Sequence, residues 1–367
     1  MKDILTPEGH GAEANAARTL PGWCYTSEDQ FLAEKTGVLE SGWHCLGRSD
    51  EIPDTGDFLT AQVMDEPLIA VRGKDGAIRV LSNICRHRAM PLVQGSGSTK
   101  RFLCPYHAWS YRLDGSLLRA PHMENVTFDP KECRLPEFPC VEWNGFVYVS
   151  LSDDATGLAA QLSGLDALIQ AYDPEAYEIV HSEEEIWHCN WKCLVENFME
   201  GYHLSVVHPK TLRGYTPTEL AKKAASGDGF TSYIAHYPDN IPPRGTGAPG
   251  LSPDQRHASA LFAVFPTQVV SISANLLVSL NLRPIDPQSV SVRWTMSIYP
   301  GDRDDELIRQ RINLWREVNR EDREKLELLQ KGLSSRHAVP GPLAGRDMEG
   351  TIRDFHLWLA RHGAVTR

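Results

Sequence analysis

Two short segments, Cys85-Arg86-His87 and Cys104-Pro105-Tyr106-His107, constrain this chain more than any other feature. Each supplies one thiolate and one imidazole, and 16 residues separate His87 from Cys104. Zinc sites usually pair like ligands or use four Cys. One sulfur and one nitrogen per segment instead suit a two-iron, two-sulfide cluster, with two Cys on one iron and two His on the other. A mixed Cys/His zinc knuckle, or four residues close only in sequence, are the alternatives.

Composition excludes several classes of protein. The 367 residues are enough for two domains, and 41% hydrophobic with 23% charged residues is typical of a globular protein. A formal net charge of −11 argues against nucleic acid or an anionic membrane as partner. The segment from Met1 to Pro7 has no signal-peptide pattern, and no apolar run nears about 18 residues. We therefore expect a cytoplasmic protein without disulfides, whose six other Cys are mostly buried.

A first domain is predicted over residues 41–151 and is all-β. Strand-like runs at 68–71 and 77–81 flank Lys74-Asp75-Gly76, a hairpin signal, and 146–151 forms the last strand. Both Cys/His segments lie in loops of this domain. The polar segment 152–157 is the expected linker to a second domain.

The second domain comprises residues 152–367 together with 1–40, and its expected fold is α+β. Residues 1–20 are expected to begin loosely. Hydrophobic periodicity predicts helices at 27–39, 159–172, 190–208, 304–331 and 350–362, and strands at 179–188, 278–283 and 290–298. Residues 213–258, rich in Gly and Pro, are expected to be one long irregular segment, such as a lid or pocket wall. The domain should be an antiparallel sheet that grips a long helix.

A second group of ligand-type residues lies between 193 and 208. On one helix, Cys193, Glu196, Asn197, Glu200 and His203 would share a polar face. His203 and His208 are five residues apart, about 140° on a regular helix, so they meet at one metal only where the helix is distorted or ends. Two neutral His with one carboxylate form the facial triad of non-haem Fe(II) oxygenases. The alternative is a pair of structural histidines.

The carboxylate is expected from the long C-terminal helix. Asp322 falls in the middle of its apolar stripe, whereas Glu321 points about 100° away. An Asp among apolar positions is costly unless it is paired or binds a metal. Asp322 is therefore the predicted third ligand, and an ordinary ion pair with Arg311 or Arg323 is the alternative.

The chain resembles the catalytic alpha subunit of the Rieske non-haem iron oxygenases, the ring-hydroxylating dioxygenase family. The resemblance rests on Cys85, His87, Cys104 and His107, on Asn190-Trp191-Lys192 leading to Glu196-Asn197, Tyr202-His203 and His208, and on Glu321-Asp322. It implies a Rieske 2Fe–2S cluster on the first four residues, a mononuclear Fe(II) on His203, His208 and Asp322, and a helix-grip catalytic domain. It also implies catalytic roles for Glu200, Asn197 and Tyr202. Glu200 would bridge to His107 of the partner subunit within a head-to-tail trimer or a hexamer.

The resemblance further implies a function. A terminal oxygenase component would use O2 and NAD(P)H-derived electrons, delivered by a separate reductase or ferredoxin, because the chain has no Gly-rich dinucleotide fingerprint. Glu at position 200 is similar to the branch that oxidises quaternary ammonium compounds such as carnitine and glycine betaine. This favours N-demethylation or hydroxylation of such a small-molecule substrate. Hydroxylation or O-demethylation of an aromatic acid is the alternative, and a Rieske electron carrier or redox sensor without chemistry of its own is a third possibility.

A docking surface for the redox partner is also predicted. Arg86, Arg88, Lys100 and Arg101 flank the cluster ligands and are expected to form a local positive patch. An ordinary solvated loop surface is the alternative.

Overall fold

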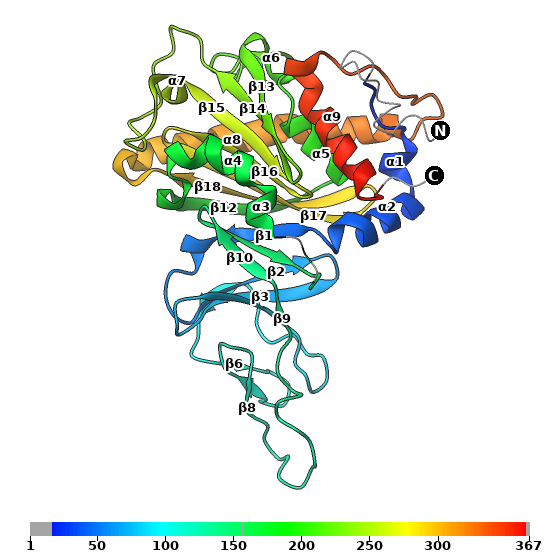
Figure 1. Cartoon of the computed structure of the whole chain (residues 1–367), viewed down its shortest axis with the longest axis vertical. Helices are drawn as coiled ribbons and strands as arrows, with labels where there is room; N and C mark the ends of the chain where they lie inside the picture. The colour runs from blue at the N-terminus through cyan, green and yellow to red at the C-terminus, as the bar shows by residue number, and fades with distance from the viewer. Residues whose placement is uncertain (1–16, 154, 156, 365–367) are drawn as a thin grey trace. The chain divides into compact units, whose positions relative to one another are not determined.

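The computed structural model describes residues 17–153, 155 and 157–364. The chain divides into two compact units, here called the β unit (Glu40–Ala155) and the mixed unit, which holds the residues on either side (Figure 1). The sequence predicted domain bounds of 41–151. Residues 154 and 156 of the expected linker, and most of the expected loose segment 1–20, lie outside the described residues.

The β unit consists of three small antiparallel sheets. Their strands, in spatial order, are β1 (Trp43–Arg48), β11 (Phe146–Ser150) and β10 (Cys140–Trp143); then β5 (Ser96–Ser98), β2 (Asp57–Val63), β3 (Glu66–Arg72), β4 (Ile78–Ser82) and β9 (Glu137–Phe138); then β6 (Phe102–Leu103), β7 (Ser110–Tyr111) and β8 (Leu117–Arg119). The predicted hairpin is present, because β3 pairs with β4 around the turn at Asp75-Gly76. Buried apolar side chains of β2, β3 and β4 pack onto the third sheet, so the loops that follow β4 and β6 start from a fixed base.

The mixed unit is built on one seven-stranded antiparallel sheet. Its strands, in spatial order, are β12 (Glu178–Trp187), β18 (Ser289–Ile298), β17 (Leu276–Asp286), β16 (Gln268–Ser273), β15 (Ala258–Val264), β14 (Phe230–His236) and β13 (Ala221–Ser226). The predicted strands at 179–188, 278–283 and 290–298 are confirmed as β12, β17 and β18. β17 is buried on nearly its whole length and lies in the interior of the sheet, between β18 and β16.

The prediction of one irregular segment over 213–258 was wrong. Residues 221–226 and 230–236 form β13 and β14, and a short helix, α7 (Pro253–Arg256), follows. The sequence Ala221-Lys222-Lys223-Ala224-Ala225-Ser226 has little intrinsic strand preference. Pairing with neighbours across the sheet decides its conformation, which is how strand propensity is usually overridden. Residues 213–217 and 237–252 remain irregular.

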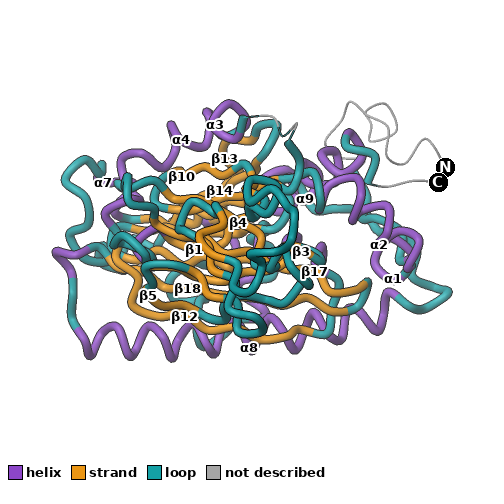
Figure 2. The backbone as a smooth tube through the Cα atoms, turned by 90° about the horizontal axis from the view of Figure 1, so that it is seen from below, coloured by secondary structure: helices purple, strands orange, loops and turns teal. Residues whose placement is uncertain are grey.

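Helices pack against the sheet. They are α1 (Trp23–Thr26), α2 (Glu28–Glu34), α3 (Leu158–Gln161), α4 (Ser163–Ile169), α5 (Trp191–Phe198), α6 (Leu204–Val207), α8 (Asp305–Leu333) and α9 (Arg346–Arg361), with a π-helical turn at Lys35–Leu39. The long helix α8 runs beside β12 and contacts α5 and α6, whereas α9 packs on β13 and β14 (Figure 2). Asp304 caps α8 by accepting from Leu307 N–H at 2.8 Å, and Ser27 caps α2 by accepting from Gln30 N–H.

The described start of the chain is packed rather than loose. Ala17 and Leu20 are buried, and Arg18 pairs with Pro342 in an isolated β-bridge. None of the described helices combines the length and apolarity needed to span a bilayer.

Candidate metal centres

The two Cys/His loops of the β unit have the same backbone design. In each, the N–H of the fourth residue after the Cys donates to the Cys carbonyl: Ala89 to Cys85 at 3.0 Å, and Ala108 to Cys104 at 3.1 Å. The Cys85 N–H donates to the Met90 carbonyl at 2.9 Å, and the Cys104 N–H donates to the Trp109 carbonyl at 2.7 Å. Both alanines have positive φ, 55° and 59°, a conformation that costs energy for a side chain with a Cβ. The same strained conformation in both loops indicates that the loop backbones hold the Cys and His side chains in defined directions.

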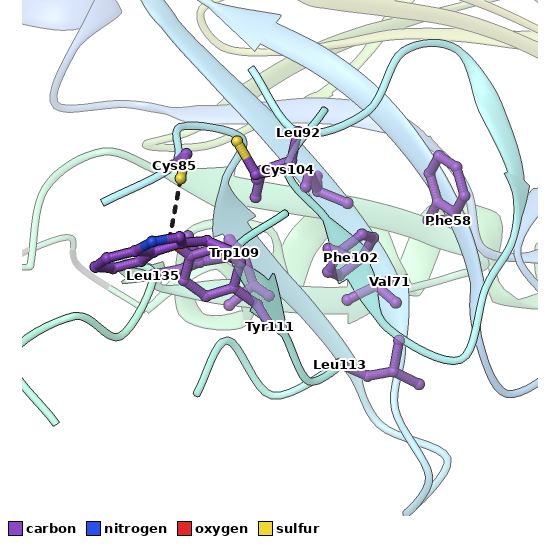
Figure 3. Packing of buried hydrophobic residues seen from close by; sticks show 12 residues of the cluster. Phe58, Val71, Cys85, Leu92, Phe102, Cys104, Trp109, Tyr111, Leu113 and Leu135 are labelled. Carbon is purple, nitrogen blue, oxygen red and sulfur yellow. Dashed lines mark hydrogen bonds between the residues drawn. The ribbon is translucent and has the colours of Figure 1, made fainter. Parts of the chain in front are cut away.

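The aimed side chains differ in exposure. Cys85 and Cys104 are 2% and 3% exposed within an apolar cluster, and Figure 3 shows both sulfurs at its edge. His87 and His107 are exposed, with ring centroids 4.8 Å apart, and His87 stacks on Trp109 at 4.9 Å. Burial raises the pKa of the Cys85 thiol, and the neighbouring Cys104 raises that pKa further. Two sulfurs inside and two imidazoles outside match a cluster with a Cys-bound and a His-bound iron.

One further contact bears on this cluster. The Tyr111 hydroxyl lies 3.3 Å from Cys85 Sγ, so it can donate to a ligand sulfur, one of the ways in which proteins adjust cluster potential.

In the mixed unit, the prediction of one helix over 190–208 was wrong. The helix α5 ends at Phe198, and a new turn of helix, α6, begins at Leu204. The chain bends between them at Gly201, where a Cβ would lie 2.4 Å from the Ala221 Cβ, so β13 leaves no room for a side chain. The expected common polar face therefore does not form: Glu200 and His203 lie beyond α5. This break brings His203 and His208 together, with ring centroids 5.3 Å apart.

Asp322 completes this group from the middle of α8. Its Oδ1 lies 3.1 Å from His208 Nε2 and 3.7 Å from His203 Nε2. The predicted alternative, an ion pair with Arg323 or Arg311, is absent among the described residues; Arg323 pairs with Glu185 instead. Three side chains from a turn, a short helix and a long helix thus converge on one point.

Each imidazole is oriented by its own carboxylate. Glu200 lies 2.5 Å from His203 Nδ1 and also accepts from the backbone N–H groups of Tyr202 and His203. Glu321 lies 2.8 Å from His208 Nδ1 and accepts from Thr211 Oγ1 at 2.6 Å. Because the carboxylates accept Nδ1–H, both Nε2 lone pairs point toward Asp322. Sequence analysis missed Glu321 and Thr211. The general rule that metal-binding His donates its second nitrogen to a carboxylate was the available signal.

The residues fit a divalent cation. Among the described residues, Asp322 Oδ1 is a buried carboxylate oxygen without a hydrogen-bond partner, and it faces two unprotonated nitrogens. Such an atom is costly unless an ion or water satisfies it. Burial opposes protonation of His208, but Asp322 and Glu321 outweigh that effect and raise its pKa above the ordinary value. A bound cation would take the place of that proton. Two nitrogens and one carboxylate oxygen are the donor set of non-haem Fe(II).

The remaining predicted residues lie around this triad. Asn197 is half-buried in the last turn of α5, and Tyr202 is 57% exposed. Tyr233, on β14, is buried beside the triad. Its burial, and the charges of Glu200 and Asp322, raise the pKa of its phenol well above the ordinary value.

Comparison with known proteins agrees with this geometry. A family model for the Rieske 2Fe–2S domain matches residues 42–139. A second, for the ring hydroxylating alpha subunit (catalytic domain), matches residues 172–364, just over half of the chain. The chain belongs to the ring-hydroxylating alpha-subunit family. This membership confirms the expected Rieske domain and α+β catalytic domain, and it accounts for both ligand groups within one chain.

Relatives within this family act on quaternary ammonium compounds, as their names state. The carnitine monooxygenase oxygenase subunit of Escherichia coli (strain K12) is 35% identical over 211 residues, which span 56% of each chain. The glycine betaine monooxygenase oxygenase subunit of Chromohalobacter salexigens is 28% identical over 93% of this chain and 84% of its own. A quaternary ammonium Rieske monooxygenase solved with the substrate L-carnitine has a TM-score of 0.85 and 26% identity, over 98% of this chain and 99% of that chain.

Proposed function

We propose that this chain is the terminal oxygenase subunit of a monooxygenase that hydroxylates a carbon attached to the nitrogen of a small quaternary ammonium compound. The observation that carries the proposal is the convergence of His203, His208 and Asp322 around an unsatisfied buried carboxylate oxygen. An electron carrier or redox sensor has no use for this second site. The named substrates of the relatives support the substrate class.

The charge around the triad favours a cationic head group. Glu200, Glu321 and Asp322 are three carboxylates in contact with two imidazoles. With a divalent metal bound and neutral imidazoles, these groups leave a net charge of about −1. A quaternary ammonium next to this centre is attracted, whereas the carboxylate of an aromatic acid in the same place is repelled. Tyr233 adds a buried aromatic side chain at the same point, which also favours a cation.

Fe(II) held by the triad would supply the reductive activation of O2, which takes two electrons and two protons and leaves one oxygen atom in the substrate and one in water. The chain's residues hold that site rigid: Glu200 and Glu321 orient the imidazoles, and Asp322 supplies the anionic ligand. Hydroxylation of a carbon bonded to the ammonium nitrogen yields a hemiaminal. Its C–N bond then breaks, releasing a tertiary amine, an aldehyde and a proton. Attack on an N-methyl group releases formaldehyde.

Electron supply and assembly belong to the same proposal. A separate reductase or ferredoxin would deliver NAD(P)H-derived electrons, and the exposed Arg86, Arg88, Lys100 and Arg101 are the proposed docking patch. A homotrimer or hexamer would place Glu200 against His107 of the partner subunit. The conservative variant Glu200→Gln still offers an oxygen to His203 Nδ1. With iron supplied in excess, the variant is expected to keep both metal sites filled while turnover slows strongly; normal turnover would count against the bridge.

The cysteines support a reducing compartment such as the cytoplasm. All eight are free, and Cys133 and Cys140 are only half-buried. Free, partly exposed thiols are typical of proteins that are kept reduced.

The experiment is product analysis with iron-replete protein, a general reductase, NADH and ¹⁸O2. A panel of betaines, carnitine-like amines and aromatic acids is offered, and amines, aldehydes and labelled products are scored by mass spectrometry. We expect an aldehyde and a tertiary amine from a quaternary ammonium compound. A labelled phenol or diol from an aromatic acid, with no reaction of any ammonium compound, would overturn the substrate class.

Iron content tests the class of protein independently. An oxygenase holds about three irons per chain, two in the cluster and one at the triad, whereas a carrier or sensor holds about two. A chain that binds only two irons would overturn the oxygenase assignment.

A further inference from the structure

One buried amide lies next to the triad and has no use in the fold. Asn319 is in the middle of α8 and is 3% exposed, among the buried apolar side chains of Val318 and Leu326. Within the described part of the chain, its Nδ2 has no hydrogen-bond partner. A buried amide that donates to nothing costs free energy, because it has given up its hydrogen bonds to water. Such a group in a folded protein calls for an explanation.

The helix places Asn319 beside Asp322. Asn319 lies three positions before Asp322 on a regular 29-residue helix, so the two side chains share a face, with Cβ atoms about 5–6 Å apart. Asp322 Oδ1 also lacks a hydrogen-bond partner among the described residues, and it belongs to the candidate metal ligands. Although they are neighbours, the two groups do not bond each other. A donor and an acceptor without partners thus lie within one helical turn, at the same site.

A second buried amide on the same helix shows what a structural role looks like. Gln330 is 4% exposed, and both ends of its amide are used. Its Oε1 accepts from Asn190 N–H at 2.9 Å, and its Nε2 donates to the Tyr25 carbonyl at 3.0 Å, so it joins α8 to α1 and to the start of α5. The Nδ2 of Asn319 makes no such connection. Contacts between helices therefore do not account for Asn319, whereas a molecule bound at the triad would.

The charge of the site decides which chemical group suits this amide. With a divalent metal bound, the triad and its two supporting carboxylates carry a net charge of about −1, so a substrate carboxylate next to them is repelled. Asn319 is neutral and offers no compensating charge. A hydroxyl is neutral too, and it can accept from the amide N–H and donate to the amide oxygen. The amide therefore fits a hydroxyl better than a carboxylate.

We infer that Asn319 contacts the substrate and binds a hydroxyl group that lies about two carbons from the quaternary nitrogen. The inference rests on the proposed function and narrows its substrate class to quaternary amino alcohols. The short spacer follows from the helix. Three residues rise only about 4.5 Å along α8, so the hydroxyl must lie close to the carbon that is oxidised at the triad.

Anaerobic calorimetry of the iron-replete protein tests this contact with a matched pair of probes. (2-Hydroxyethyl)trimethylammonium carries the hydroxyl, and propyltrimethylammonium replaces it with a methyl group. The natural protein should bind the first about tenfold more tightly, because only the first makes the hydrogen bond. Asn319→Leu keeps the size of the side chain without its polar atoms. It should remove that preference, leave the affinity for propyltrimethylammonium within about twofold, and keep about three irons per chain.

Thermal unfolding separates substrate binding from a structural role. Asn319→Leu removes an amide N–H that bonds to no described residue, so the melting temperature should stay the same or rise. Gln330→Leu is the matched control, because it removes a buried amide whose two ends are both bonded. Its melting temperature should fall by about 4 °C or more.

Four results would overturn the contact. They are equal affinity of the natural protein for both probes, the same change or no change for both probes in Asn319→Leu, a fall in melting temperature as large as that of Gln330→Leu, and loss of the third iron. Failure of the proposed function looks different. If no ammonium compound is oxidised, but the uncharged 3,3-dimethylbutan-1-ol still binds in an Asn319-dependent way, the hydroxyl contact stands and the ammonium assignment fails.

Discussion

The two candidate metal centres of this chain present their ligand-type residues in opposite ways. The Cys/His centre takes all four ligands from a stretch of 23 residues, Cys85 to His107, on two loops with the same hydrogen bonds. The triad takes its ligands from residues 203, 208 and 322, and it needs a helix break and a 29-residue helix to bring them together. When local backbone geometry forms a centre, its ligands stand at recognisable spacings in the sequence. When tertiary packing forms a centre, the sequence shows only single His, Asp or Glu residues without a fixed spacing.

The two centres also differ in what supports the ligands. At the Cys/His centre, both imidazoles are exposed; His87 stacks on Trp109, and the His87 and His107 rings contact each other. At the triad, each imidazole is held by a carboxylate, Glu200 or Glu321. We therefore expect the first centre to depend mainly on its own ligands, and the second to depend strongly on its surrounding carboxylates.

The largest effect is expected from Cys104→Ala. Loss of one thiolate should remove the whole cluster, so iron falls from about three to about one per chain and activity disappears. Iron analysis and the visible absorption of the cluster measure this. Cys133→Ala, a half-buried thiol of the same unit, should keep both. Retention of two cluster irons in Cys104→Ala would show that this residue is not a ligand.

Asp322→Asn should remove the other centre alone. Iron is expected to fall from about three to about two per chain, with a loss of iron affinity greater than about 100-fold, while the cluster absorption is unchanged. The matched control is Asp305→Asn, which lies in the exposed first turn of the same helix. If the variant keeps three irons, Asp322 has a structural role and the third ligand must be sought elsewhere.

Glu321→Gln tests the carboxylate that supports His208. An amide can accept Nδ1–H but carries no charge, so we expect about 10- to 100-fold weaker iron binding at the triad and a full cluster. Titration of the iron-free triad with Fe(II) under anaerobic conditions measures the affinity. Glu324→Gln, an exposed change one turn along, is the control. Unchanged affinity would mean that the triad, like the cluster, relies on its ligands alone.

The smallest effect is expected from Tyr111→Phe. The hydroxyl beside Cys85 Sγ stabilises the more negative, reduced cluster, so its loss should lower the reduction potential by about 20–60 mV without loss of iron. Potentiometric titration followed by absorption measures the shift. Tyr106→Phe changes an exposed phenol next to His107 and should leave the potential where it was. A reduction potential that rises, or does not change, would show that the Tyr111 hydroxyl does not stabilise the reduced cluster.

Much of the fold followed from periodicity. The strands β12, β17 and β18 and the helix α8 were predicted close to their observed bounds, because their apolar positions alternate, or recur every three to four residues, over long stretches. The strands β13 and β14 were missed; β13 is an Ala- and Lys-rich segment, which becomes a strand only when a neighbouring strand supplies its hydrogen bonds. The prediction of a single helix over 190–208 was wrong for a related reason. The local sequence around Gly201 does not indicate that β13 packs against it.

The sequence by itself indicated the family, and it predicted Cys85, His87, Cys104 and His107 as cluster ligands and His203, His208 and Asp322 as candidates for the triad. Tertiary structure alone decided that Glu321 faces His208 rather than pointing away, because α8 lies close enough to α6 for the longer side chain to reach. Spacing along a chain records contacts within one element, whereas contacts between elements depend on how the sheet packs its helices.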